Sequence, residues 1–372
     1  GRGEHLGLCP FHNEKTPSFT VSDNKGFYHC FGCGAHGDAI KFLMEHRGLT
    51  YVEAIKELAE IAQIPLPKYS TQDYKKQREI SDSYEVMELA AKWFEDNLYK
   101  SENYKAREYL FEKRGLSKQT VEKFRIGFVP EGWEGLKNHL SSKGVELKNL
   151  QANGLVSENE SGTRIYDRFR NRIIFPIFDS TGKVIAFGGR ILTDEKNAPK
   201  YLNSPETDLF NKSYVLYGYN FARDVAYQKE RVVVTEGYMD VISLHQEGIE
   251  EAVAPLGTSV TQTHLLQLWK MCKAPIFCMD GDEAGFRASK RLAENFISML
   301  QPGKTMKFAF LPKGYDPDDV ISQNGVSTFE KMLSNSEILS DALWDIKLRD
   351  VDLKTPEAKA EFADDLYKII SK

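Results

Sequence analysis

Hydrophobic positions in the second half of the chain fall into short runs separated by amphipathic stretches. Four runs between residues 231 and 320 are rich in β-branched and aromatic residues and predict strands: "RVVVTE", "EAVAP", "APIFCMD" and "KFAFLP". The segments between them repeat apolar residues at i, i+3 and i+4, which predicts helices over 238–247, 261–271 and 284–299. Strands that alternate with helices predict an α/β fold, a parallel sheet with helices packed on it.

The first 83 residues follow a different pattern. Short strand-like runs, "SFTVS" and "GFYHCF", lie among glycines, cysteines and histidines in residues 1–37. Apolar residues at helical spacing then predict two helices, over about 38–47 and 51–63. Residues 64–83 contain two prolines and many polar residues without a period, which predicts a linker.

Helices and strands are mixed in the middle of the chain. Helices are predicted near 84–99, 103–113 and 117–124, and strands in "RIIFPIFD" and "VIAFGG". A last helix is predicted over 356–372. The chain as a whole is therefore predicted to be α+β, with its α/β part toward the C-terminus.

Length and composition place the chain among globular proteins. Its 372 residues are 41% hydrophobic and 28% charged, which allows two or three domains with sizeable cores. No apolar run approaches the roughly 18 residues of a membrane span, and no signal-peptide pattern opens the chain, so we expect a cytoplasmic protein without a membrane partner. The chain starts Gly1-Arg2-Gly3 without an initiator Met, and we expect a fragment of a longer protein.

The net charge of −5 hides two regions of opposite sign. Residues 164–190 hold six basic against two acidic residues, a local charge of +4, whereas residues 231–320 hold nine basic against twelve acidic residues, a local charge of −3. A basic strip beside an acidic module suits a site that holds an anionic polymer and metal ions together.

Two closely spaced pairs of metal ligands lie near the N-terminus. Cys9 and His12 form a C-x2-H pair, and Cys30 and Cys33 form a C-x2-C pair after seventeen further residues. Two such pairs can close a tetrahedron around zinc and leave no open position, so we expect one structural Zn²⁺. The alternative is a buried Cys/His cluster without an ion, which is rare at this spacing. Spacing alone favours His12 over the other nearby histidines, which are His5, His29 and His36.

Acidic residues follow three of the predicted strands. Glu236 ends one strand, Asp280 ends another with Asp282 two positions later, and Asp316 and Asp318 follow a third. Residues at the carboxyl ends of parallel strands converge on the crevice where ligands bind. Two carboxylates about 4 Å apart repel by roughly 4 kcal/mol at an effective dielectric constant of 20, so such a cluster needs a cation. We expect hard divalent ions with oxygen ligands, Mg²⁺ or Mn²⁺.

A structural explanation competes with metal binding. An acid that follows a strand is often the N-cap of the next helix, and we would prefer that reading for any single acid. Glu236 has poor cap chemistry, however, and "DGD" followed by "EAG" places two acids before one helix. These observations favour metal binding for the group.

The motifs and their order resemble known families. "EGYMD" at 236–240 and "DGDEAG" at 280–285 are similar to the signature of the Toprim domain, which bacterial primases, topoisomerases and some nucleases share. Together with the C-H-C-C ribbon, "YDRFRNRIIFPIFD", "FGGR", "PKYLNSPET" and "DPDD", they resemble the bacterial DnaG-type DNA primases from one end of the chain to the other.

The resemblance implies a domain organisation. The expected parts are a zinc ribbon with two helices and a truncated N-terminus (1–63), a linker (64–83), a basic subdomain of the RNA polymerase domain (84–225), a Toprim domain (226–320) and a C-terminal helical segment (321–372). The helicase-binding domain that family members carry is expected to be absent from this chain.

The resemblance also implies a function, DNA primase. The ribbon would recognise a single-stranded DNA template, and the middle domains would polymerise ribonucleoside triphosphates de novo into short primers, giving an RNA–DNA hybrid. The replicative helicase would bind through the absent domain, and we expect a monomer. Glu236, Asp280 and Asp282 are the expected catalytic residues, and with Asp316 and Asp318 they would hold two or more divalent ions. Whether Glu236 is a ligand or a general base stays open.

Basic residues just before the acidic module are the expected phosphate contacts. Arg168, Arg170 and Arg172 alternate, so on a strand they would share one face and present a row of guanidinium groups. The alternative is a solvated strand face. Arg190 belongs to the same basic strip, and Asn171, on the other face of that strand, is counted among the expected contacts. By resemblance, Lys200, Tyr201, Asn203 and Lys212 are expected to lie beside the active site and to contact nucleotide phosphates or the template–product duplex. The four tryptophans are expected in the core rather than as stacking platforms.

Two other classes of function remain open. Another Toprim enzyme, such as a nuclease, would leave the ribbon and the arginines without a clear use, and a topoisomerase would need a nucleophilic tyrosine in a further large domain. A zinc-containing module that only binds single-stranded DNA predicts that alanine at Asp280 and Asp282 leaves function intact.

Overall fold

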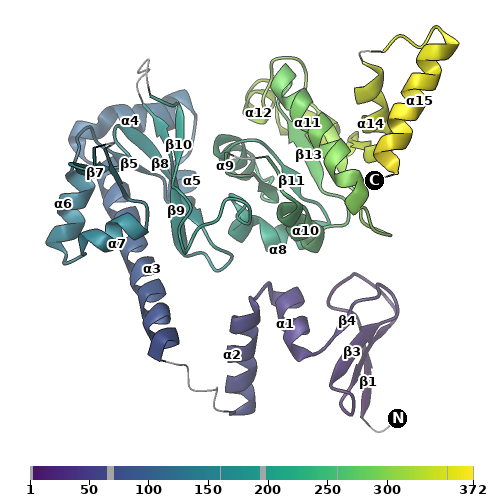
Figure 1. Cartoon of the computed structure of the whole chain (residues 1–372), viewed down its shortest axis with the longest axis horizontal. Coiled ribbons are helices and arrows are strands. Elements are labelled where there is room, and N and C mark those ends of the chain that lie inside the picture. The colour runs from purple at the N-terminus through teal and green to yellow at the C-terminus, as the bar shows by residue number, and fades with distance from the viewer. Residues whose placement is uncertain are drawn as a thin grey trace. The chain divides into compact units, whose positions relative to one another are not determined.

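The computed structural model divides the chain into two compact units, Gly1–Gln77 and Arg78–Lys372 (Figure 1). The residues it describes are 3–64, 71–159, 161–192, 198–257, 259–349 and 351–371. The predicted linker over 64–83 contains the boundary between the two units, but it is not irregular throughout, because helix α3 (Thr71–Leu98) already begins at Thr71. Residues 65–70 of that linker lie outside the described residues.

The first unit is a small antiparallel sheet followed by two helices. Its strands pair in sequence order, and they are β1 (Glu4–Gly7), β2 (Phe19–Ser22), β3 (Phe27–Cys30) and β4 (His36–Gly37). Helices α1 (Ala39–Arg47) and α2 (Tyr51–Ala62) agree with the predicted ranges to within one residue. Each begins at a side-chain cap, because Asp38 accepts from the Lys41 backbone N–H and Thr50 accepts from that of Glu53.

The second unit begins with helices packed on a four-stranded antiparallel sheet of order β10-β9-β8-β5. The helical elements are α3, η1 (Ser101–Asn103), α4 (Tyr104–Glu108), the π-helical turn η2 (Tyr109–Lys113), α5 (Lys118–Lys123), α6 (Gly135–Ser142) and α7 (Leu147–Ala152). The sheet strands are β5 (Gly127–Val129), β8 (Arg172–Phe178), β9 (Val184–Ile191) and β10 (Tyr201–Asn203). A separate hairpin pairs β6 (Val156–Glu158) with β7 (Ile165–Asp167). The mixed pattern predicted for 84–225 is confirmed.

The rest of this unit is built on a five-stranded sheet of order β12-β11-β13-β14-β15, whose first four strands are parallel and whose last is antiparallel. The strands are β11 (Val233–Val234), β12 (Ala252–Val253), β13 (Ile276–Met279), β14 (Lys307–Phe310) and β15 (Glu337–Ile338). The helical elements are α8 (Tyr219–Lys229), α9 (Tyr238–Gln246), α10 (Gln262–Met271), α11 (Glu283–Phe296), η3 (Ile297–Met299), α12 (Pro317–Asn324), α13 (Val326–Ser334), α14 (Leu339–Leu348) and α15 (Pro356–Ile370).

Helices cover both faces of this parallel sheet (Figure 1). Val234 and Phe277 share a core cluster with residues of α8, α10, α11 and α14. Val233 and Cys278 share another with residues of α9, α12 and α13. Strands buried on both faces read as continuous apolar runs, which is the pattern that "VVV" and "IFCM" show. The predicted α/β region is confirmed.

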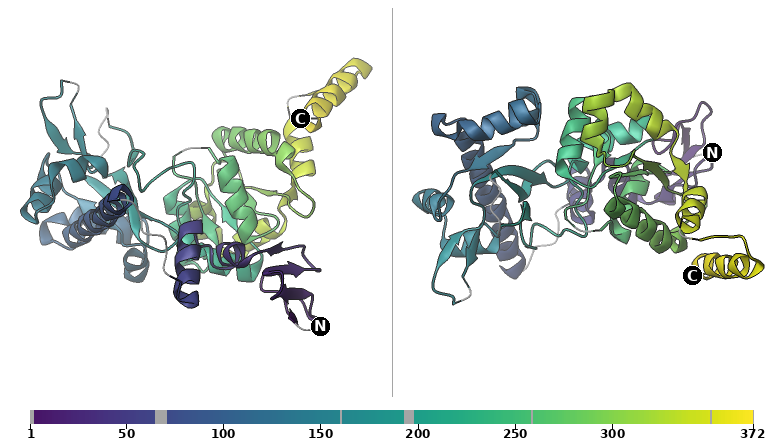
Figure 2. Two further views of the ribbon diagram at one scale, coloured as in Figure 1. Left: turned by 60° about the horizontal axis from the view of Figure 1, so that its bottom comes forward. Right: turned by 90° about the horizontal axis from the view of Figure 1, so that it is seen from above.

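The chain ends in α14 and α15, which lie at one end of the second unit (Figure 2). Trp344 of α14 and Phe362 of α15 meet edge to face with ring centroids 5.1 Å apart. Within the described part of the chain, no helix combines the length and apolar character that crossing a membrane requires.

Candidate active site

The structure gathers four of the predicted acids around a cavity of about 470 Å³ at the carboxyl end of the parallel sheet. Glu236 follows β11, Asp280 follows β13, and Asp316 and Asp318 follow β14, and all four line the cavity. The Asp280 backbone N–H donates to Glu236 Oε1 at 3.1 Å and joins two of these strand ends. Acids separated by 82 residues in the sequence therefore share one site because parallel strands end at one edge.

Asp282 lies on a different side of this acidic cluster. It borders a second cavity, of about 650 Å³, which Asp280 also lines. Asp282 Oδ1 accepts from the backbone N–H groups of Ala284 and Gly285, both at 2.8 Å, and thereby caps α11. Asp316 caps α12 in the same way, because its Oδ1 accepts from the Asp319 N–H at 2.7 Å. The capping explanation therefore holds for these two aspartates, and it leaves the second oxygen of each free for another partner.

The carboxyl group of Asp280 is held in an unfavourable environment for a negative charge. Burial, followed by repulsion from Glu236 and Asp316, raises the pKa of Asp280 to about 7. Its Oδ1 is buried and has no hydrogen-bond partner among the described residues. Burial also raises the pKa of Glu236. An unpartnered buried oxygen among like charges needs a cation, and carboxylate oxygens are the ligands that Mg²⁺ and Mn²⁺ prefer, so the donor set fits a divalent ion.

A fifth acid at this site was not singled out from the sequence. Asp240 in the first turn of α9 lines the same cavity and is only 8% exposed. Burial, followed by the charges of Asp280 and Asp316, raises the pKa of Asp240 well above its ordinary value. Its Oδ2 accepts from the Gly237 backbone N–H at 3.0 Å. The signal was present, because "EGYMD" ends on this residue four positions after Glu236.

The opposite wall of the cavity is polar and basic. Lys200, just before β10, and Tyr201 and Asn203 within β10 line it, as predicted by resemblance for a place beside the acids. Tyr238 donates a short hydrogen bond from its hydroxyl to Asn203 Oδ1. Its ring packs so closely on the β9 backbone that a Cβ at Gly188 would lie 2.8 Å from it.

Arg114 is a further residue that the sequence gave no reason to select. It follows the π-helical turn η2, lines the cavity, and its guanidinium lies 3.4 Å from Asp318 Oδ2. Its Nε donates to the Tyr109 hydroxyl at 2.7 Å. The guanidinium of Arg190 lies over the same Tyr109 ring, 4.5 Å from its centroid. Arg190 and Lys212 were both predicted as contacts, but neither lines the cavity.

The prediction that three arginines share one strand face is wrong. Residues 168–171 form a loop between β7 and β8, and Asn171 has a positive φ of 50° that breaks the alternation. Arg168 donates to the carbonyl oxygen of Asn203 at 2.8 and 3.1 Å. Arg172 is buried, 4% exposed, and donates to the carbonyl oxygens of Gly189 and Pro199 at 3.1 and 2.9 Å. These two side chains brace the backbone around β9 and β10.

Arg170 points to a different surface. Its guanidinium lies 4.3 Å from the ring centroid of Trp133 and 4.9 Å from that of Tyr166. Trp133 is 48% exposed and Trp344 is 47% exposed, so the prediction that the tryptophans belong to the core is wrong for these two. It is confirmed for Trp269, which is 4% exposed.

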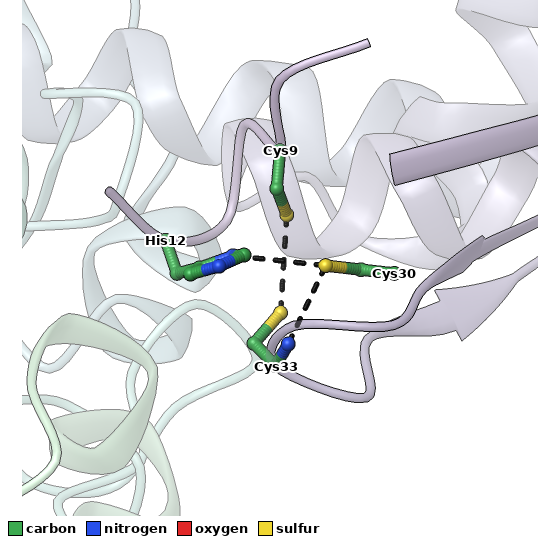
Figure 3. A group of neighbouring side chains, drawn as sticks. All are labelled: Cys9, His12, Cys30 and Cys33. Atoms are coloured by element: carbon green, nitrogen blue, oxygen red, sulfur yellow. Dashed lines mark hydrogen bonds between the residues drawn. The ribbon is translucent and has the colours of Figure 1, made fainter. Parts of the chain in front are cut away.

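The predicted metal ligands of the first unit converge. One ligand atom from each of Cys9, His12, Cys30 and Cys33 lies within 4.8 Å of all the others (Figure 3). Cys30 Sγ lies 3.7 Å from His12 Nδ1, and Cys9 Sγ lies 3.8 Å from Cys33 Sγ. This closed Cys3His set is the ligand set of a structural zinc site.

A second layer of contacts orients these ligands. His12 directs Nδ1 at the thiols while its Nε2 lies 3.2 Å from Glu14 Oε2, the arrangement in which a carboxylate fixes the ring of a ligating histidine. Glu14 Oε1 also accepts from the Cys9 backbone N–H at 2.8 Å. The structure brings His12, rather than His5, His29 or His36, to the three thiols.

The turn between Asp280 and Asp282 depends on a glycine. A Cβ at Gly281 would lie 2.0 Å from the carbonyl oxygen of Pro312. The backbone N–H of Gly281 donates to the carbonyl oxygen of Tyr315 at 2.8 Å. We expect Gly281→Ala to lower the free energy of unfolding by about 1–3 kcal/mol, because the two loops must separate. Urea denaturation measures this, with Gly135→Ala as the control, since a Cβ there meets nothing closer than 3.4 Å. Equal stability of the two variants would contradict the close packing.

The raised pKa of Asp280 predicts a pH dependence of stability in the absence of divalent ions. The unfolded carboxyl loses its proton near its ordinary pKa of 3.8, whereas the folded one keeps it up to about pH 7. The folded state binds more protons across this window, so this contribution to stability falls as the pH rises from about 4 to about 7. We expect the melting temperature to drop less from pH 5 to pH 8 in Asp280→Asn than in wild type. Equal drops would contradict the prediction.

A zinc-ligand ribbon, a mixed subdomain and a parallel sheet with acids at its carboxyl edge define a Toprim-type catalytic core joined to a zinc finger. Comparison with known families agrees: residues 1–74 match the CHC2 zinc finger, residues 93–223 the N-terminal domain of the DNA primase catalytic core, and residues 233–321 the Toprim-like family. The chain belongs to the bacterial DnaG-type DNA primases.

Individual relatives support this assignment. A DNA primase of Pseudomonas putida is 41% identical over 362 residues, which cover 96% of this chain and 54% of that protein, so the chain spans about half of its length. A DnaG primase catalytic domain solved with single-stranded DNA is 38% identical with a TM-score of 0.71, over 79% of this chain and 94% of that one. The zinc-binding and RNA polymerase domains of the Aquifex aeolicus primase are 29% identical with a TM-score of 0.64, over 100% of this chain and 91% of that one.

Proposed function

We propose that this chain synthesises short RNA primers de novo on single-stranded DNA, as a template-directed nucleotidyltransferase. The observation that carries the proposal is the 470 Å³ cavity, in which five acids face Arg114 and Lys200 across one space. Such a site accommodates metal-bound triphosphate on one side and further phosphate charge on the other. A module that only binds DNA has no use for a buried carboxylate without a partner.

The reaction assigns a part to each wall of the cavity. The 3′-hydroxyl oxygen of one nucleotide attacks the α-phosphorus of the next, the new P–O bond forms, the bond to the β-phosphate oxygen breaks, and pyrophosphate leaves. Divalent ions, Mg²⁺ or Mn²⁺, held by Glu236, Asp280 and Asp282 with Asp316 and Asp318, would lower the pKa of the hydroxyl and neutralise the triphosphate. Lys200 and Arg114 would stabilise the charge that develops on the phosphoryl oxygens. Glu236, whose pKa is raised by burial, would accept the hydroxyl proton if it does not hold an ion.

The proposed partners follow from the same chemistry. The related catalytic domain solved with single-stranded DNA supports a single-stranded template here. The proposed template surface of this chain includes Arg170 on the exposed Trp133, because guanidinium and indole groups suit phosphates and bases. Ribonucleoside triphosphates are the proposed substrates, and an RNA–DNA hybrid is the product. A replicative helicase is a further proposed partner.

The test is incorporation of labelled ribonucleotides on unprimed single-stranded DNA with Mg²⁺ or Mn²⁺. We expect short RNA whose synthesis depends on the template and on the divalent ion. Cleavage of the DNA instead would identify a Toprim nuclease. Binding of the DNA without either reaction would identify a binding module, and both results would overturn the proposal.

A further inference from the structure

A second cavity meets the first at Asp280. Its volume is about 650 Å³, and it lies between the Asp280–Asp282 turn, the start of α11, the end of β14 and the end of α14. Asp280 lines both cavities, whereas Asp282 lines only this one. The space is within the range of small-molecule sites, and of the residues that line it the primer reaction proposed above uses only Asp280 and Asp282.

Aromatic side chains form one part of its wall. Phe286 from α11 and Phe310 at the end of β14 both line the cavity, and Phe310 is 39% exposed. Arg349 from the end of α14 lies over the Phe286 ring, 4.1 Å from the centroid, and is held there by Glu283 at 3.0 Å. An accessible ring beside a ring covered by a guanidinium group suits a flat aromatic ligand such as a nucleobase.

Cations form another part of the wall. Lys313, in the loop after β14, and Arg287, in α11, are exposed and line the cavity. Among the described residues neither has an acidic partner within 4.0 Å, unlike the neighbouring Arg349. Two exposed cations without a partner beside an aromatic wall suit a ligand that carries a polyphosphate as well as a base.

We propose that this cavity binds the initiating nucleoside triphosphate of the primer. De novo synthesis needs two nucleotides at once, one that supplies the 3′-hydroxyl and one that is attacked at its α-phosphorus, and two cavities that share Asp280 provide adjoining places for them. The base packs on Phe310, the triphosphate lies toward Lys313 and Arg287, and the 3′-hydroxyl lies at the Asp280 end. This assignment rests on the proposed primase activity.

Binding is tested first, because it does not depend on RNA synthesis. The full chain is irradiated with 8-azido-ATP in the presence of Mg²⁺, and the labelled peptides are identified by mass spectrometry. We expect label on the peptides that carry Phe286 or Phe310, reduced about tenfold in Phe310→Ala, since losing one stacking contact costs about that factor. Tyr367→Ala is the matched control, because Tyr367 is an exposed ring outside the cavity. Label confined to the first cavity, unchanged in Phe310→Ala, would overturn the proposal.

Kinetics then separate initiation from extension. We expect Phe310→Ala and Lys313→Glu to raise the KM for nucleotide about tenfold in dinucleotide formation and to leave extension of an annealed RNA primer unchanged. Lys359→Glu is the control for the charge change, because Lys359 is exposed on α15 away from the cavity. Equal effects on initiation and extension would refute an initiating site. If wild type makes no RNA even from a primer, the primase proposal fails, and the labelling result alone then decides whether the cavity binds nucleotide.

Discussion

Asp280→Asn is expected to reduce RNA synthesis about 10²–10³-fold while making the protein more stable in the absence of divalent ions. The loss of activity follows from removing a charge that would hold the ions of the transition state. The gain in stability follows because Asp280 is buried beside Glu236, Asp240 and Asp316, so neutralising it relieves repulsion. Incorporation of labelled ribonucleotides measures the first effect, and thermal denaturation without added Mg²⁺ measures the second.

The two readouts protect this experiment from a folding artefact. A variant that loses activity because it unfolds would melt at a lower temperature, whereas this one should melt higher. Asp341→Asn is the control, because Asp341 is an exposed acid in the first turn of α14, outside both cavities. Full RNA synthesis by Asp280→Asn would show that the charge of Asp280 is not needed for catalysis.

Cys30→Ser is expected to abolish zinc binding and unfold the first unit while the second stays folded. Cys30 is fully buried at the centre of a small core with Phe19 and Tyr28, so the ion and the apolar cluster depend on each other. Binding free energy of a structural zinc ion is on the order of 10 kcal/mol, which is more than so small a core supplies. Zinc content of the full chain should fall from one equivalent to less than about a tenth.

Limited proteolysis locates the damage in this variant. We expect cleavage within residues 3–64 and an intact fragment that begins near residue 78, the boundary between the two units. His36→Asn is the control, because His36 is exposed and its Nδ1 bonds to the Gly34 carbonyl oxygen, outside the ligand set. A normal zinc content in Cys30→Ser, or zinc loss in His36→Asn, would show that the ligands are assigned wrongly.

The parts of the site that could be predicted from the sequence are those fixed by local geometry. Cys9 with His12 and Cys30 with Cys33 each sit on one tight turn, so their spacing alone reports the ligand pairs. Glu236 and Asp280 could be placed at one edge because each ends an apolar run, and parallel strands end together.

What the sequence did not reveal depends on contacts between distant segments. Arg114 reaches Asp318 across 204 positions, and no local pattern records that approach. Asp240 lies in the first turn of α9, and its burial against the other acids could not be predicted from the sequence. The prediction that Arg168, Arg170 and Arg172 share one strand face was wrong because it relied on local alternation alone. The left-handed backbone at Asn171 interrupts that alternation, and the guanidinium groups of Arg168 and Arg172 donate to backbone carbonyl oxygens.

The two helix caps at the acidic edge also restrict how an ion could be held there. Asp282 and Asp316 each commit Oδ1 to backbone N–H groups, so each offers a single oxygen, in a side chain whose rotamer is already fixed. Ordering a free side chain costs about 0.5–1.5 kcal/mol. Because the caps already order these two side chains in the folded protein, ion binding does not include that cost. One-oxygen ligands also suit the octahedral shell of Mg²⁺ better than the larger Ca²⁺ shell, which often takes both oxygens of a carboxylate. We therefore expect this edge to favour the smaller ion.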